Sequence, residues 1–207
     1  IPGARVIREG QVVGVDAGAI LDGGGAVPRA RLARKTIAEA TGAGRAPAGE
    51  RAVANHDEDP VTLMVEAALA AAGDGLPGVD LVVCATTSAP CVEKSSAALV
   101  VEACDGGAGV ATIDLAGSRR CGLEALWIAQ TAVRAGAATR ALACAADVRP
   151  VAPGDPFELR ATDAGCAFLV GHGDVPALAL IEASGHAHAE AWDQWRREGE
   201  PVRTEDA

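Results

Sequence analysis

The chain has 207 residues, of which 49% are apolar, 22% are charged and 2% are aromatic. This apolar share excludes an intrinsically disordered chain, and the length suits one large domain or two small ones. The formal net charge of −10 disfavours nucleic acid as a partner, because nucleic-acid binding depends on clustered Lys and Arg side chains.

The cysteines and the lengths of the apolar runs indicate the compartment. The six cysteines form no C-x-x-C pair, and several lie within apolar segments, as Cys144 does. This pattern is typical of buried thiols in a reducing compartment, and not of a disulfide framework or a zinc site. No apolar run reaches the ~20 residues that span a bilayer, and residues 1–10 have no signal-peptide pattern. We therefore expect a cytoplasmic protein that has no membrane partner.

An apolar segment near the N-terminus runs into a glycine-rich stretch. Residues 12–25 predict a short strand followed by a turn or mobile loop at residues 22–25. Neither G-x-G-x-x-G nor G-x-x-x-x-G-K-[ST] is present, so a plain turn is favoured over a phosphate site. Residues 31–43 then predict a short amphipathic helix, with apolar side chains at helical spacing and Gly42 as its stop.

An acidic segment precedes the next helix. Pro60 follows Asp59, and this pair is typical of a helix start at which Asp59 is the N-cap. Residues 61–72 predict an Ala-rich helix. The acidic residues beside His56 suggest a metal cluster, but consecutive residues cannot all face one ion, so a solvated cap is the favoured interpretation.

Strands and helices alternate between residues 79 and 146. Apolar, β-branched runs predict buried strands, and the segments between them predict helices. The strands are expected at 79–87, 110–115 and 139–146, and the helices at 95–103 and 122–135. This alternation predicts a parallel α/β sheet. Chemistry in such a sheet collects at the carboxyl ends of the strands, here the loops after Ala85, Leu115 and Ala146.

Several segments in a fixed order carry a resemblance to a known superfamily. They include DLVVCATT at 80–87, DLAGSRRCG at 114–122, TDAGCAFLVG at 162–171 and WRREGEP at 195–201. Over residues 26–203 this order resembles the N-terminal half of thiolase-superfamily condensing enzymes. The most similar groups are 3-hydroxy-3-methylglutaryl-CoA synthases and ketoacyl synthase III, also called ketoacyl-ACP synthase III.

The resemblance implies an α/β, thiolase-like fold with α-β-α-β-α layers, built from two similar halves. This chain supplies the N-terminal half, with a mostly parallel central sheet. We expect an N-terminal strand and glycine-rich loop at 1–25 and the thiolase-like half at 26–175. Residues 176–207 are expected to connect toward a C-terminal half that is missing, and because the chain begins without Met we expect a fragment or a processed form.

The resemblance also implies acyl transfer or carbon–carbon condensation from an acyl-CoA thioester. Coenzyme A thioester is then a substrate, and no bound cofactor is expected. In the family a cysteine at the start of a helix accepts the acyl group. A thiol there has a lowered pKa, and backbone N–H groups hold the developing oxyanion. Alignment without gaps from Asp114 to Leu126 puts Arg119 at this position, and arginine stays protonated and cannot be the nucleophile.

Two neighbours of Arg119 are candidate catalytic residues. Ser118 is either a replacement acyl acceptor that needs a base or the N-cap of the next helix. Cys121 is either a displaced nucleophile or a buried thiol. Four interpretations stay open for Arg119 and Arg120. They either bind an anionic substrate, cap the site, contact a partner chain, or form a solvent-exposed pair.

Other family features are absent from the sequence. The synthases place a glutamate general base in the loop that here begins at Thr86. This loop has no carboxylate before Glu93, and in this respect the chain resembles ketoacyl synthase more than hydroxymethylglutaryl-CoA synthase. His186 and His188 are spaced for one face of a strand, but a surface loop is favoured over a metal site.

These departures leave a second function open. The chain is then a catalytically degenerate subunit that scaffolds a heteromeric acyltransferase complex. The expected partners are acyl-CoA and either a second copy, in a homodimer, or thiolase-like and zinc-ribbon/OB-fold proteins in a heteromer.

Overall fold

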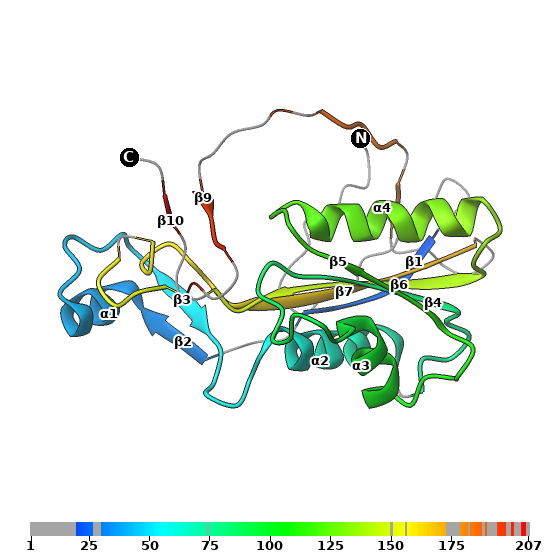
Figure 1. The fold of residues 1–207 in the computed structure, drawn as a ribbon, viewed down its shortest axis with the longest axis horizontal. Coiled ribbons are helices and arrows are strands. Elements are labelled where there is room, and N and C mark those ends of the chain that lie inside the picture. The colour runs from blue at the N-terminus through cyan, green and yellow to red at the C-terminus, as the bar shows by residue number, and fades with distance from the viewer. Residues whose placement is uncertain are drawn as a thin grey trace.

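The computed structural model describes residues 20–26, 30–73, 75–149, 151–155, 157–172, 179–181, 183–187, 189, 194–197, 200 and 204–205. Its main sheet contains β1 (Ile20–Ala26), β4 (Leu81–Ala85), β5 (Ala111–Leu115), β6 (Arg140–Asp147), β7 (Ala164–Gly171) and β8 (Ala179–Leu180). Three helices pack on it, namely α2 (Pro60–Ala72), α3 (Ser96–Ala103) and α4 (Cys121–Arg134). Helix α4 covers one face of the sheet and α2 and α3 cover the other, which gives three layers (Figure 1).

The sheet is mixed, with the strand order β5-β4-β6-β7-β1-β8. Strands β5, β4 and β6 pair in parallel, whereas β6 with β7, β7 with β1, and β1 with β8 pair antiparallel. Because two antiparallel pairings separate β1 from β6, these two strands run in the same direction. Only β7 and β8 oppose the others, so the expectation of a mostly parallel sheet is confirmed.

Strand β4 is buried on both faces, as its apolar run predicts. Val82 and Cys84 face the core beneath α2 and α3, and Leu81, Val83 and Ala85 face the core beneath α4. All five residues are at most 7% exposed. Alternation of side chains along a strand thus builds both cores from one continuous apolar segment.

The start of α2 has the predicted N-cap. The Asp59 carboxylate accepts a hydrogen bond from the Thr62 backbone N–H at 2.8 Å, and the Thr62 hydroxyl accepts one from the Asp59 N–H. Pro60 occupies the first turn. The side chain of His56 is 97% exposed and lies beside Asp57, so the acidic segment is a solvated cap.

Three expectations from the sequence are wrong. Residues 22–25 form part of β1, not a turn. The helix expected over 31–43 is α1 (Arg34–Thr41), because residues 31–33 belong to the strand β2 (Ala30–Ala33), although Gly42 ends the helix as expected, in the left-handed conformation. Strand β5 is not buried, because it is the edge strand of the sheet and three of its five residues are exposed.

A smaller unit lies beside the main sheet. It contains α1 and the antiparallel pair of β2 and β3 (Glu50–Val53), and it lies at the carboxyl end of β4 and β6 (Figure 1). The buried side chains of Arg51 and Asp163 form an ion pair at 3.6 Å, and Asp163 also accepts the backbone N–H of Ala54 at 3.0 Å. This pair joins the smaller unit to the start of β7. Two further short strands, β9 (Gln194–Trp195) and β10 (Thr204–Glu205), pair with each other.

No helix in the described part of the chain is both long and apolar enough to cross a membrane.

Close packing of α2 on β7 gives a stability prediction. A Cβ atom at Gly165 would lie 2.8 Å from the Leu63 carbonyl oxygen, a backbone atom that cannot move away easily. We expect Gly165→Ala to lower the free energy of unfolding by about 1–3 kcal/mol, measured by urea denaturation. Gly107→Ala is the matched control, because a Cβ there has nothing within 4 Å. Equal stability of both variants would contradict the packing.

Candidate active site

The Asp147 carboxylate at the end of β6 holds the loop that follows β4. Its Oδ1 atom accepts hydrogen bonds from the Thr87 backbone N–H at 2.7 Å, the Ser88 hydroxyl at 2.9 Å and the Thr86 hydroxyl at 3.0 Å. The Thr87 hydroxyl also lies 3.1 Å from both carboxylate oxygens. Two strand ends that the chain separates by about sixty residues are therefore fixed together at the edge where the sequence predicts chemistry.

Two arginines lie at the same strand ends. The Arg149 guanidinium hydrogen-bonds the Thr87 hydroxyl and lies 3.9 Å from Asp147 Oδ2. Arg196 donates a hydrogen bond to the Thr87 carbonyl oxygen at 3.5 Å. The Arg149 side chain is partly buried, at 18% exposed, and Arg196 is exposed.

The turn between β5 and α4 contains the first candidate residue. Ser118 is exposed, and its hydroxyl accepts the backbone N–H of Arg120 at 3.1 Å. Its carbonyl oxygen accepts the N–H of Cys121 at 3.0 Å. Ser118 therefore shapes the turn that precedes α4, and Arg120 occupies the N-cap position where Ser118 was one expectation. Gly117 allows the turn by taking a φ of 80°.

Cys121, the second candidate, is the first residue of α4 and is only 4% exposed. Burial raises the pKa of its thiol, and the negative charges of Asp147 and, to a smaller extent, Glu124 raise this pKa further. The thiol is therefore uncharged at neutral pH. A helix N-terminus alone would lower the pKa of a thiol. Here burial and the nearby negative charges raise the pKa of Cys121 by more than the helix lowers it.

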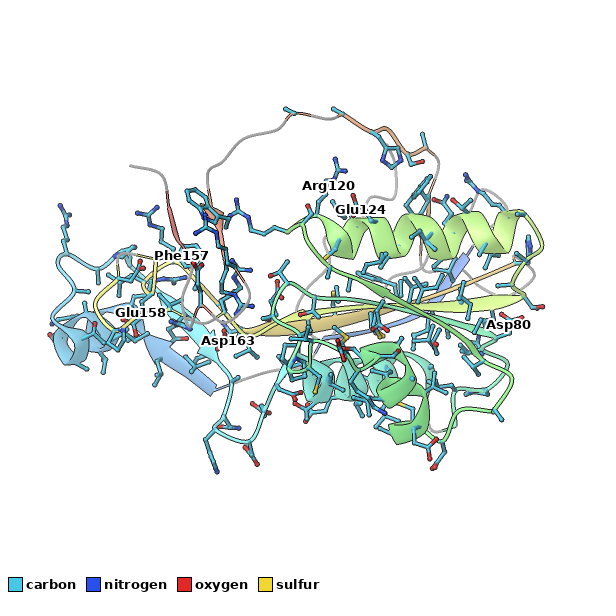
Figure 2. The ribbon with its side chains drawn as sticks, in the orientation of Figure 1. Asp80, Arg120, Glu124, Phe157, Glu158 and Asp163 are labelled. Atoms are coloured by element: carbon cyan, nitrogen blue, oxygen red, sulfur yellow. The ribbon has the colours of Figure 1, made fainter. Side chains whose placement is uncertain are left out.

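The two arginines in the turn differ in their contacts. Arg120 forms an ion pair with Glu124 at 2.8 Å, one turn along α4, and donates to the Ala187 carbonyl oxygen at 3.0 Å (Figure 2). Arg119, which we expect at the position of the family cysteine, is exposed. Figure 2 places Arg120 and Asp163 toward one end of the sheet and Asp80 at the opposite end.

The two histidines that the sequence analysis considers for a metal site are His186 and His188. His186 packs edge-to-face on Trp127 of α4, with 5.0 Å between the ring centroids, and His188 lies outside the described residues. The described ranges contain no group of three or more metal-ligating side chains.

Asp147 and Arg149 are the functional candidates that sequence reasoning missed. The signal was present, because a carboxylate and a guanidinium at the carboxyl end of a predicted parallel strand lie where such sheets place their sites. Their convergence on Thr87 depends on pairing between β4 and β6, which the sequence pattern alone does not reveal.

Thiol labelling tests the state of Cys121. At pH 7.5 we expect iodoacetamide to label the exposed Cys91 about tenfold or more faster than the buried, uncharged Cys121, as measured by mass spectrometry of peptides. In guanidinium the two rates should become similar. Labelling of native Cys121 as fast as Cys91 would show a reactive thiolate and contradict this description.

Comparison with known proteins identifies the fold. No model of a protein family matches the chain. The chain is 32% identical to hydroxymethylglutaryl-CoA synthase from Pyrococcus furiosus over 180 residues, which are 86% of this chain and 51% of that protein. The synthase from Archaeoglobus fulgidus is 32% identical over 155 residues, 73% of this chain and 44% of that protein.

Comparison with solved structures gives the same two groups of similar proteins. A crystal structure of HMG-CoA synthase complexed with CoA superposes with a TM-score of 0.74 at 20% identity, covering 90% of this chain and 50% of that one. The 3-oxoacyl-(acyl carrier protein) synthase III of Pseudomonas aeruginosa gives a TM-score of 0.66 at 25% identity, covering 81% of this chain and 54% of that one. The chain spans about half the length of these relatives. The chain therefore has a thiolase-like fold and resembles the N-terminal half of hydroxymethylglutaryl-CoA synthase and of ketoacyl synthase III.

Proposed function

We propose that the chain binds an acyl-CoA thioester at the carboxyl ends of β4 and β6 and serves acyl transfer or condensation. The observation that carries the proposal is the exposed turn between β5 and α4, adjoining the loop that Asp147 holds. Similarity to acyl-CoA condensing enzymes over 86% of the chain supports it.

In this proposal Ser118 accepts the acyl group. Its hydroxyl oxygen attacks the thioester carbonyl carbon, the carbon–sulfur bond breaks, and the serine proton passes to the departing CoA thiolate. Ser118 is the exposed hydroxyl in the turn, whereas Cys121 is buried and uncharged at neutral pH. A serine hydroxyl is a weak nucleophile without a base, so the base comes from outside the turn.

A second candidate function is a non-catalytic subunit of an acyltransferase complex. The raised pKa of the Cys121 thiol favours it, as does the expectation that Arg119 stands at the family cysteine position. Such a subunit binds the thioester or its partners without forming an acyl-enzyme. We also propose that the subunit forms either a homodimer or a heteromer with thiolase-like and zinc-ribbon/OB-fold proteins. Its proposed location is the cytoplasm.

The outer face of α4 is the proposed contact with a second α/β half. Leu123 is 71% exposed and Trp127 is 42% exposed on this face. They line a groove of about 350 Å³ between α4 and residues 181 and 184–187. The relatives are about twice as long as the span that this chain matches, so a second half of similar size is the occupant that fits. We also propose that the thiolase-like half covers residues 26–175, between the N-terminal segment 1–25 and the connecting segment 176–207.

Acyl labelling separates the two candidate functions. The whole chain is incubated with ¹⁴C-acetyl-CoA, and its peptides are mapped for label. We expect label on the peptide that contains Ser118 and its loss in Ser118→Ala, while Ser184→Ala, an exposed serine in the α4 groove, keeps it.

An Arg119→Cys variant is the informative companion, because it restores a thiol at the family position. Label on this variant but not on the wild-type chain would support the non-catalytic subunit and contradict Ser118 as acyl acceptor. Label that persists in Ser118→Ala would contradict both Ser118 as the acyl acceptor and the non-catalytic subunit, because an acyl-enzyme would then form at another residue.

A further inference from the structure

Residues 184–187 cross the outer face of α4, on the side of the helix away from the sheet (Figure 1). The Ala187 carbonyl oxygen accepts a hydrogen bond at 3.0 Å from Arg120, at the start of the helix. The Ile181 carbonyl oxygen accepts one at 3.1 Å from Arg134, at the end of the helix. Two arginines thus hold this part of the chain at both ends of α4, and we call residues 184–187 the strap.

The contacts with the strap follow one side of the helix. Arg120, Trp127 and Arg134 are spaced seven residues apart, so their side chains lie along nearly the same line of α4. Between the two arginines, the ring of His186 packs edge-to-face on Trp127, with 5.0 Å between the centroids. The strap therefore follows the helix axis, with an anchor at each end and a ring contact between them.

The strap is held by these directional contacts and not by close packing. All four of its residues are exposed. A groove of about 350 Å³ remains between the strap and α4, and a Cβ atom added at Gly185 would meet nothing within 4 Å. A segment with few buried apolar contacts opens at a much lower cost in free energy than the core does. The strap can therefore leave the helix without unfolding the sheet.

The helix face beside the strap is apolar. Leu123 and Trp127 line the groove and are still 71% and 42% exposed. Apolar side chains grouped in this way mark an interaction site. At the start of α4, the Arg120 backbone N–H donates to the Ser118 hydroxyl at 3.1 Å. One anchor of the strap therefore belongs to the turn that contains the proposed acyl acceptor.

We propose that residues 184–187 form a displaceable strap that gates access to the outer face of α4. A partner that covers this face displaces the strap, and the Arg120 guanidinium, next to the turn at Ser118, then loses its contact with the Ala187 carbonyl oxygen. This inference rests on the proposed function, because the partner concerned is the second α/β half proposed for this face.

Fluorescence of Trp127 tests the strap. Trp192 and Trp195 are replaced by Phe in the whole chain, which leaves Trp127 as the only tryptophan. Quenching by acrylamide then measures how far solvent reaches its ring. Because Trp127 is 42% exposed with the strap in place, we expect Arg134→Gln to raise the Stern–Volmer constant about twofold. Binding of the apolar dye anilinonaphthalene sulfonate should rise with it.

Three further variants complete the design. Arg120→Gln removes the other anchor and should have the same effect. Arg134→Lys keeps a charged donor for the Ile181 carbonyl oxygen, so we expect quenching close to that of the parent chain. Arg45→Gln is the matched control, because Arg45 is an exposed arginine that does not line the α4 groove. Circular dichroism melting curves verify that each variant is folded.

The outcomes are distinct. Quenching and dye binding in Arg134→Gln and Arg120→Gln that equal those of Arg45→Gln would overturn the strap. A rise in only one of these two variants would assign the effect to that arginine's contacts within α4 and would also overturn it. Neither readout involves a thioester, so an overturned strap leaves the proposed function standing. A chain that takes no acyl label would in turn leave the strap standing.

Discussion

The carboxylate of Asp147 is the interaction on which the candidate site depends. It stands at the end of β6 and accepts hydrogen bonds from three hydroxyls and one backbone N–H of the loop after β4. An ionised acceptor at a partly buried position gains more from each bond than a neutral one does. This carboxylate holds the loop after β4, and Arg149 and Arg196 both hydrogen-bond Thr87 of that loop. Its negative charge also raises the pKa of the Cys121 thiol.

The layers explain how the turn at 117–121 reaches the same place. Strand β4 pairs in parallel with both β5 and β6, so the carboxyl ends of all three strands share one edge of the sheet. Helix α4 starts at this edge and packs closely on β6, since a Cβ atom at Gly122 would lie 3.0 Å from the Ala145 Cβ. Close packing of small residues thus brings the start of α4 to Asp147. The same packing buries Cys121 and leaves Ser118 exposed.

The sequence was a good guide where one local signal decides the structure. The Asp59 cap of α2 and the fully buried strand β4 are confirmed because capping chemistry and a continuous apolar run act locally. It failed for β5, whose sequence resembles a buried strand although its position at the sheet edge exposes Ala111, Thr112 and Asp114 and leaves Ile113 and Leu115 only partly buried. Of the site, the strand ends were predictable, but the meeting of Arg149 and Arg196 at Thr87 depends on tertiary contacts.

In the proposed function, the thioester binds at the strand ends that Asp147 holds together. Hydrogen–deuterium exchange of the whole chain, with and without saturating acetyl-CoA, tests it most directly. We expect slower exchange in residues 86–88, 117–121 and 147–149, with unchanged exchange at the opposite end of the sheet near Asp80. Unchanged exchange in all three segments, with protection elsewhere, would contradict it.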